Sequence, residues 1–246
     1  MININMEITL DSIKDIKLYQ SKNGYRFSVD ALLLYSFVNI PRIKRIADLG
    51  AGSGIVGLLF AKKYPDARVS LFELQESLAA TAEKNITLNS LEDRVKIIKT
   101  DIREISPCNS SFGIGNCFDI VVSNPPFRKP KTGLISPEEE KAIARHEIKL
   151  KLTELVGVAR RLLKSKGRFF LIYHPERLTE LIGTLKEEGM EIKRLRFVHS
   201  RVSSEAKMVL VEAVKGGRGG LKVERPFYIY NENGGYSDEM YEVYGE

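Results

Sequence analysis

A glycine-rich segment near residue 50 has the residue types of a loop that holds a nucleotide-like ligand. In the stretch DLGAGSG, Gly50, Gly52 and Gly54 alternate after Asp48. Glycines in such a turn permit positive φ and let a ligand press against bare backbone. Two ligands fit the spacing. Residues 52–57 match the G-x-G-x-x-G pattern of dinucleotide-binding loops, whereas a carboxylate before the first glycine is typical of loops that hold S-adenosylmethionine.

Charge separates these two ligands. The pyrophosphate of a dinucleotide is anionic, so a carboxylate at the end of the preceding strand would repel it. The methionine part of S-adenosylmethionine carries an ammonium group and a sulfonium, and a carboxylate at Asp48 attracts both. The loop therefore favours S-adenosylmethionine. Two alternatives stay open, a nicotinamide-dependent oxidoreductase and a tight strand-to-helix turn that binds no ligand.

Acidic residues also stand at the ends of the next two predicted strands. Glu73 can accept hydrogen bonds from both ribose hydroxyls, and Asp101, or the backbone N–H beside it, can read the edge of an adenine. In open α/β sheets, ligands bind at the carboxyl ends of the strands, where these side chains meet. The expected donor-binding set, which includes neighbours of these residues, is Asp48, Gly50, Ala51, Gly52, Gly54, Glu73, Leu74, Asp101 and Ile102.

The motif Asn124-Pro125-Pro126-Phe127 is the strongest chemical signal in the chain. Its two prolines remove two backbone donors and stiffen the turn, so carbonyl groups and the Asn124 side chain face outward as acceptors. Such acceptors suit a planar amino group: taking both of its N–H bonds draws the nitrogen toward a tetrahedral geometry and frees its lone pair to attack a methyl sulfonium. Phe127 offers a face for stacking. Catalysis then rests on orientation and electrostatic preorganisation, and the alternative is a rigid strand-end turn.

Alternating apolar runs and helical patterns must position these motifs. We expect strands at 45–49, 68–73, 95–98, 119–123, 168–173, 192–198 and 207–214, with helices at 55–63, 76–88, 152–164 and 175–188. Gly167 and Gly189 stand where helix C-caps would fall. The alternation predicts an α/β fold with a mostly parallel sheet wound on both sides. The last two strands are joined by a segment too short for a crossover helix, so they should pair antiparallel.

Two segments flank this core. We expect residues 1–40 to form an N-terminal extension of a strand and a helix that packs on the core. Residues 41–215 would form the ligand-binding core and residues 216–246 a C-terminal extension. The latter opens on GGRGG, which we interpret as a flexible turn rather than an RNA-binding RGG segment.

Composition limits the class of protein. The chain has 246 residues, 43% hydrophobic and 28% charged, with a formal net charge of +6. This balance is typical of a globular protein and excludes a disordered or fibrous one. No apolar run approaches the roughly 20 residues that span a bilayer. The N-terminus lacks the order of a signal peptide, and the two cysteines lack zinc-site spacing. We therefore expect a cytoplasmic protein with no metal and no membrane contact. The positive charge agrees with a polyanionic partner without requiring one.

The motifs DLGAGSG, FELQ, TDI and NPPF, in this order and spacing, resemble those of the class I (Rossmann-like) amino-methyltransferases. Three flanking segments, YRFSVDALLL, SPEEEKAIARHE and IYNENGGYSDEMYEVYG, resemble the bacterial valine tRNA (adenine-37, N6)-methyltransferase family. The similarity runs from about Leu18 to the C-terminus. It implies a seven-stranded, mostly parallel sheet with an antiparallel last strand, S-adenosylmethionine as methyl donor, and N6-methylation of the adenine beside the anticodon. It also implies that Phe27, Ser28 and Asp30 help to close the donor pocket.

A large anionic substrate would need basic side chains near the motif. Arg128, Lys129 and Lys131 follow it directly, where the phosphates of a flipped nucleotide would pass, and we expect them to contact RNA. Basic residues at 160–168 and 193–196 fit RNA contact or a solvated face equally well. The expected partner is the anticodon stem-loop of a tRNA, bound by a monomer or weak dimer. Rival hypotheses are glutamine or guanine-N2 methylation and a non-catalytic RNA-binding module.

Overall fold

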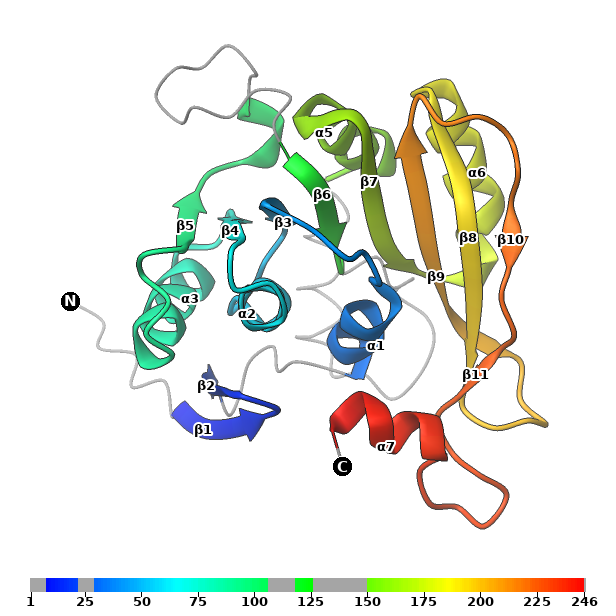
Figure 1. Cartoon of the computed structure of the whole chain (residues 1–246), viewed down its shortest axis with the longest axis horizontal. Coiled ribbons are helices and arrows are strands. Elements are labelled where there is room, and N and C mark those ends of the chain that lie inside the picture. The colour runs from blue at the N-terminus through cyan, green and yellow to red at the C-terminus, as the bar shows by residue number, and fades with distance from the viewer. Residues whose placement is uncertain (1–7, 22–28, 106–117, 126–149, 246) are drawn as a thin grey trace, which may run out of the picture.

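A twisted central sheet runs through the molecule (Figure 1). The computed structural model describes residues 8–21, 29–105, 118–125 and 150–245. In these ranges the sheet has nine strands, in the order β10-β8-β9-β7-β6-β3-β4-β5, with β11 also paired to β8. Their bounds are β3 Arg45–Leu49, β4 Arg68–Glu73, β5 Val95–Lys99, β6 Phe118–Ser123, β7 Leu163–Tyr173, β8 Met190–His199, β9 Ala206–Lys215, β10 Lys222–Val223 and β11 Phe227–Tyr228.

The strand directions confirm the predicted fold class. Strands β5, β4, β3, β6 and β7 pair in parallel, and β9 is antiparallel to both β7 and β8. The seven longer strands thus form a mostly parallel sheet whose last strand in sequence is antiparallel. The short strands β10 and β11 extend it by pairing in parallel with β8.

Helices cover both faces of the sheet, which explains why strands such as β6 and the second half of β7 are nearly continuous apolar runs. They are α1 Val29–Phe37, α2 Ile55–Lys63, α3 Glu76–Leu88, α5 Leu152–Leu162, α6 Leu178–Glu187 and α7 Asp238–Tyr244. Neighbouring residues of β3 point to opposite faces: Ile46 packs in a core with α1, α2 and α3, and Ala47 packs in a second core with α5 and α6. No helix in the described ranges has the length and apolar character that a membrane span requires.

The start of β7 corrects one sequence prediction. Strand β7 begins at Leu163 instead of residue 168, so α5 ends at Leu162 and Gly167 lies inside the strand rather than at a helix C-cap. A Cβ at Gly167 would lie 2.9 Å from the Lys164 carbonyl oxygen and 3.1 Å from that of Phe118. Close backbone approach, and not capping, requires this glycine. Gly189, with φ +65°, does follow α6 as predicted.

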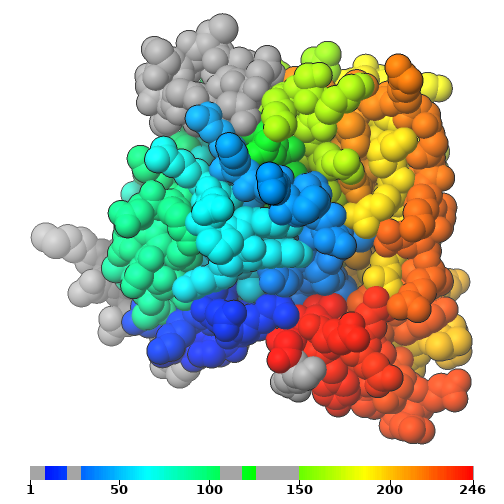
Figure 2. Space-filling model, viewed as in Figure 1, coloured from blue at the N-terminus to red at the C-terminus, as the bar shows by residue number. Residues whose placement is uncertain are grey.

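The N-terminal region begins with a hairpin rather than a single strand. Strands β1 Ile8–Ile13 and β2 Ile16–Ser21 pair antiparallel in a sheet of their own. The hairpin packs beside α2 and α3, where the space-filling view shows it in dark blue (Figure 2). At the other end, GGRGG joins β9 to β10. The division at residues 40/41 and 215/216 stays a prediction.

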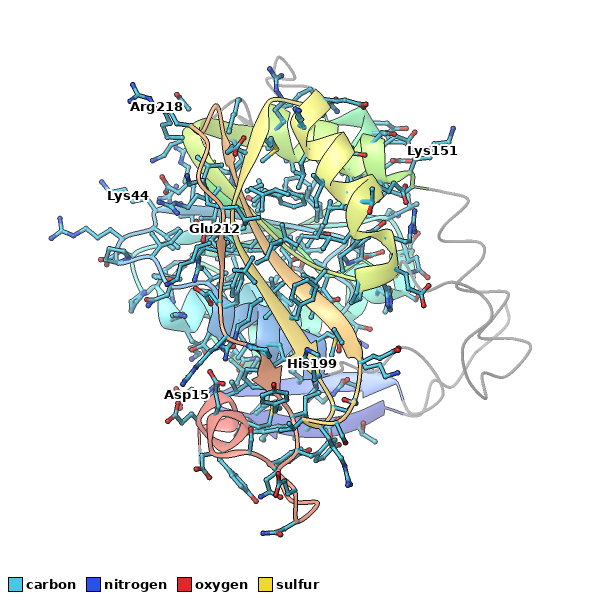
Figure 3. All side chains as sticks on the ribbon, turned by 90° about the vertical axis from the view of Figure 1, so that its right-hand side faces the viewer. Asp15, Lys44, Lys151, His199, Glu212 and Arg218 are labelled. Atoms are coloured by element: carbon cyan, nitrogen blue, oxygen red, sulfur yellow. The ribbon has the colours of Figure 1, made fainter. Side chains whose placement is uncertain are left out.

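A buried ion-pair network joins the later strands to α1 and the C-terminal segment. Glu212, labelled in Figure 3, lies on β9 and is 1% exposed. Its carboxylate accepts hydrogen bonds from Arg168 on β7 and Arg194 on β8. Arg194 also donates to Glu224, at 3.0 Å, and to the Phe37 carbonyl oxygen at the end of α1, at 2.8 Å. The Glu212 carboxylate therefore binds guanidinium groups from both strands that flank β9.

Replacing Glu212 should destabilise the fold. In Glu212→Ala the Arg194 side chain, which is 22% exposed, loses Glu212 but keeps Glu224 as a partner. A hydrogen bond to a charged group contributes about 1.5–3 kcal/mol, and we expect a loss of that size in the free energy of unfolding, measured by urea denaturation. Glu76→Ala, which breaks a pair between the exposed side chains of Lys99 and Glu76, serves as control. Equal midpoints for the two variants would contradict the role given to Glu212.

Candidate functional site

The glycine-rich turn between β3 and α2 bends over the end of β4. The backbone N–H groups of Gly50 and Ala51 both donate to the Phe72 carbonyl oxygen, at 2.9 and 3.0 Å. Gly52 has φ +58°, a left-handed conformation that favours glycine. A Cβ at Gly57 would lie 2.1 Å from Leu71 Cδ2. Glycine is therefore needed both to shape the turn and to seat α2 against β4.

The carboxylate of Glu73 fixes this turn from the neighbouring strand. Glu73 Oε2 accepts a hydrogen bond from the Gly52 amide at 2.9 Å, and Oε1 accepts one from the Gln75 amide at 2.8 Å. The residue is 5% exposed. A carboxylate offers about four acceptor positions, so two backbone bonds leave acceptor capacity for ligand hydroxyls. Its role in ribose binding stays a prediction.

Asp48 lies deeper than Glu73. It is 1% exposed, and its Oδ2 accepts a hydrogen bond from the Gly57 amide at 3.0 Å. Burial raises the pKa of Asp48 to about 7; the Gly57 hydrogen bond opposes the rise and the charge of Glu73 adds to it. The side chain supports the first turn of α2, and at neutral pH it carries only part of a negative charge. Its attraction for a cationic ligand is correspondingly reduced.

The third acidic residue caps a short turn after β5. Thr100 N donates to the Glu73 carbonyl oxygen at 3.0 Å, which brings the end of β5 to the end of β4. Asp101 Oδ1 accepts from the Arg103 amide at 3.0 Å, and the Arg103 guanidinium binds the same carboxylate. These guanidinium hydrogen bonds lower the pKa of Asp101. Ile102 is buried, whereas Leu74 is 42% exposed and offers an apolar surface at this edge.

Strand β6 brings the start of the NPPF motif to the same edge of the sheet. The Ser123 hydroxyl donates to the Leu49 carbonyl oxygen at 2.7 Å, which pins the end of β6 to the end of β3. The half-buried Asn124 and Pro125 follow directly. Asp30 is half-buried in the first turn of α1. The other predicted site residues, Phe27, Ser28, Pro126, Phe127, Arg128, Lys129 and Lys131, lie outside the described residues, and their roles stay predictions.

Sequence reasoning missed one contact to the glycine turn. Asn85, on α3, is fully buried, and its Nδ2 donates to the Ser53 carbonyl oxygen at 2.9 Å. An asparagine on the helix face that also carries Ala82 and Ile86 is a polar residue at a core position. This pattern was the available signal, because buried polar groups require partners.

Ion pairing accounts for several of the basic residues at 160–168 and 193–196. Lys164 pairs with Asp119, and Arg196 binds both oxygens of Glu239 at 2.7 Å. Arg168 and Arg194 share the buried Glu212. These cations thus have partners within the chain. No group of three or more His, Cys, Asp or Glu side chains is placed to hold a metal ion among the residues that the structure describes.

Comparisons with known proteins find relatives of this chain among the methyltransferases. The family model of the methyltransferase small domain matches residues 28–188. A relative from Porphyromonas gingivalis is 32% identical, with 84% of this chain and 81% of the relative covered, and one from Bacteroides thetaiotaomicron is 25% identical, with 94% and 93% covered. Both are named tRNA1(Val) (adenine(37)-N6)-methyltransferase.

Solved structures show the same fold. A predicted O-methyltransferase from Agrobacterium tumefaciens superposes with a TM-score of 0.70 at 24% identity, covering 88% of this chain and 95% of that one. M. jannaschii TYW2 in complex with AdoMet gives a TM-score of 0.58 at 15% identity, with 84% and 85% covered. The methyl donor of the family is S-adenosylmethionine.

Removing the Glu73 carboxylate should weaken donor binding. Glu73→Ala removes the acceptor for Gly52 and Gln75 as well as the predicted ribose contact. A hydrogen bond to a charged group contributes about 1.5–3 kcal/mol, so we expect the Kd for S-adenosylmethionine, measured by calorimetry, to rise about 10- to 100-fold. Glu76→Ala makes the same charge change at an exposed site and should bind normally. An unchanged Kd in Glu73→Ala would count against the pocket.

The raised pKa of Asp48 predicts a pH-dependent stability. Its pKa is about 7 in the folded chain against an ordinary value of 3.8, so between these values the folded state holds more protons than the unfolded state. The resulting stabilisation is fully present below about pH 4 and is lost as the pH rises through 7. The substitution Asp48→Asn keeps an acceptor for Gly57 and removes the titrating group, so we expect the variant to lose the part of the pH dependence that Asp48 contributes. Urea denaturation from pH 4 to 8 measures the free energy of unfolding of both proteins. A difference in this free energy between the two proteins that does not change with pH would refute the pKa assigned to Asp48.

Proposed function

The chain belongs to the methyltransferase small domain family, and we propose that it transfers a methyl group from S-adenosylmethionine to the exocyclic N6 of an adenine in tRNA. By analogy with its relatives, the target is adenine 37 of a valine tRNA. One observation carries the proposal: the glycine turn held by Glu73 and the start of the NPPF motif at Asn124 meet at one edge of the sheet, because Ser123 joins β6 to β3. A donor site and an amine-binding corner are thereby adjacent.

The residues at this edge fit the donor. Exposed backbone at Gly50, the remaining acceptor capacity of Glu73 and the apolar side chain of Leu74 suit a nucleoside with two ribose hydroxyls. When bound, the donor supplies a methyl group on a cationic sulfur. Asp101 and the backbone beside it would read the adenine edge, which requires its carboxylate to share hydrogen bonds with Arg103.

The acceptor amine is activated by orientation. In the proposed complex, the Asn124 side-chain oxygen and a carbonyl oxygen of the proline turn accept the two N–H bonds of the adenine amino group, while Phe127 stacks on the ring. Accepting both hydrogens localises the nitrogen lone pair toward the donor. A strong general base is unnecessary because the nitrogen becomes acidic only after it has gained the methyl group. Arg128, Lys129 and Lys131 would hold the neighbouring phosphates.

The rival acceptors, glutamine and guanine N2, present similar planar amino groups to such a corner. The names of the relatives favour adenine over both. A tRNA substrate also favours the cytoplasm as the compartment. The enzyme is proposed to act as a monomer or weak dimer, without a metal.

Replacing Asn124 should slow methyl transfer without weakening donor binding. Loss of one preorganised hydrogen-bond partner lowers kcat by about 100-fold in comparable sites, and we expect a fall of that order in Asn124→Ala. Radiolabelled methyl transfer to unmodified tRNA measures the rate, and calorimetry measures the donor Kd. Asn233→Ala, in an exposed loop, is the matched control. Full activity in Asn124→Ala would refute the role of this side chain.

The same reaction identifies the acceptor. We expect a nuclease digest of the methylated RNA, resolved by mass spectrometry, to contain N6-methyladenosine. N2-methylguanosine in that digest, or methylglutamine after incubation with a release factor, would assign a rival acceptor. RNA that is bound but remains unmethylated in the presence of donor would indicate a non-catalytic binding module.

A further inference from the structure

Two asparagines on α3, Asn85 and Asn89, hold the outer edge of the N-terminal hairpin. Asn85 Oδ1 accepts from the Tyr19 amide at 2.6 Å, and its Nδ2 donates to the Tyr19 carbonyl oxygen at 3.2 Å. Asn89 makes the same two hydrogen bonds with Lys17: its Oδ1 accepts from the Lys17 amide at 2.9 Å, and its Nδ2 donates to the Lys17 carbonyl oxygen at 2.7 Å. Each carboxamide therefore binds the N–H and C=O of one β2 residue, as a neighbouring strand would.

The spacing explains why a helix can bind a strand edge here. Residues four apart on a helix are separated by about 6 Å along its axis, and residues two apart on an antiparallel strand by about 7 Å. Asn85 and Asn89 therefore match Tyr19 and Lys17, whose backbone groups both point away from β1. The pair satisfies an edge that would otherwise present unpaired backbone groups.

The two asparagines differ in the acceptor to which the second N–H of the carboxamide donates. Asn89 Nδ2 donates it to the Asn85 carbonyl oxygen in its own helix, at 2.7 Å. Asn85 Nδ2 donates instead to the Ser53 carbonyl oxygen in the glycine turn, at 2.9 Å. Ser53 follows Gly52, whose amide is bound by Glu73. Consecutive residues of the turn are thus held from two elements, β4 and α3.

We propose that Asn85 is a positioning residue for the donor site, which couples the N-terminal hairpin to the glycine turn. Its carboxamide is fixed in orientation, because the Tyr19 and Ser53 contacts use both of its N–H hydrogens and one lone pair of its oxygen. The hairpin, which lies before the 28–188 range that the family model matches, becomes part of the support of the donor site. The inference rests on the proposed function only for the identity of the donor.

The matched pair Asn85→Ala and Asn89→Ala tests this coupling. Both variants lose a carboxamide that holds β2, but only Asn85→Ala also loses the hydrogen bond to the Ser53 carbonyl oxygen of the glycine turn. We expect the Kd and KM for S-adenosylmethionine to rise about tenfold in Asn85→Ala, as for the loss of a buried hydrogen bond, with kcat at saturating donor within about twofold of wild type. In Asn89→Ala both constants should stay within about twofold.

Hydrogen–deuterium exchange of the ligand-free protein provides a readout that does not depend on activity. Amides of residues 52–57 should exchange faster in Asn85→Ala than in wild type or Asn89→Ala, while amides of β2 exchange faster in both variants. If Asn85→Ala fails to fold, the pair Asn85→Leu and Asn89→Leu replaces it, since leucine fills nearly the same volume but can neither accept a hydrogen bond nor donate one.

Equal donor affinity and equal exchange at residues 52–57 in the two variants would overturn the inference. So would a matching loss in Asn89→Ala, which would assign the effect to hairpin docking alone. Failure of the donor assignment is distinguishable, because wild-type protein would then not bind S-adenosylmethionine in the same calorimetric titration. Failure of the proposed acceptor would appear only in the digest of the methylated product.

Discussion

The hydrogen bond between the Gly52 amide and the Glu73 carboxylate is the contact on which the site depends. It closes the turn after β3 onto the end of β4, and the same carboxylate holds Gln75 ahead of α3. One side chain thus fixes two backbone segments and offers its remaining acceptor positions to a ligand. The shape of the turn and the position of the ligand contact are therefore not independent, and the parallel arrangement of β3 and β4 is what brings them together.

The carboxylates of Asp48 and Glu73, at the ends of neighbouring strands, have different roles because they differ in burial and in hydrogen-bond partners. Asp48 lies under α2, where burial raises its pKa to about 7 and its hydrogen bond to Gly57 supports the helix start. Glu73 lies at the strand end and binds the turn itself. Charge attraction for a cationic donor is thus smaller at Asp48 than its position in the sequence pattern suggests, and its structural contribution is larger.

Elements outside the central sheet stabilise it through polar contacts as well as apolar packing. At the N-terminal side, carboxamides of α3 bind the backbone of β2. At the C-terminal side, Arg194 joins Glu212 and Glu224, and Arg196 joins Glu239 of α7. The buried members of this set, Asn85 and Glu212, would be costly to leave without partners, so they fix how the flanking segments lie on the core.

Features that depend on neighbouring residues follow from the amino-acid sequence. Periodicity and turn chemistry act over a few residues, so they predict the strands at 45–49 and 68–73 and the helices at 55–63 and 76–88 with the bounds that the structure has. Other features depend on contacts between distant segments. Gly167 belongs to a strand because Phe118 approaches it, and Asn85 binds residues 66 and 32 positions away. The polar residue at a core position of α3 indicates that Asn85 has a partner, but only the fold shows that the partners are Tyr19 and Ser53.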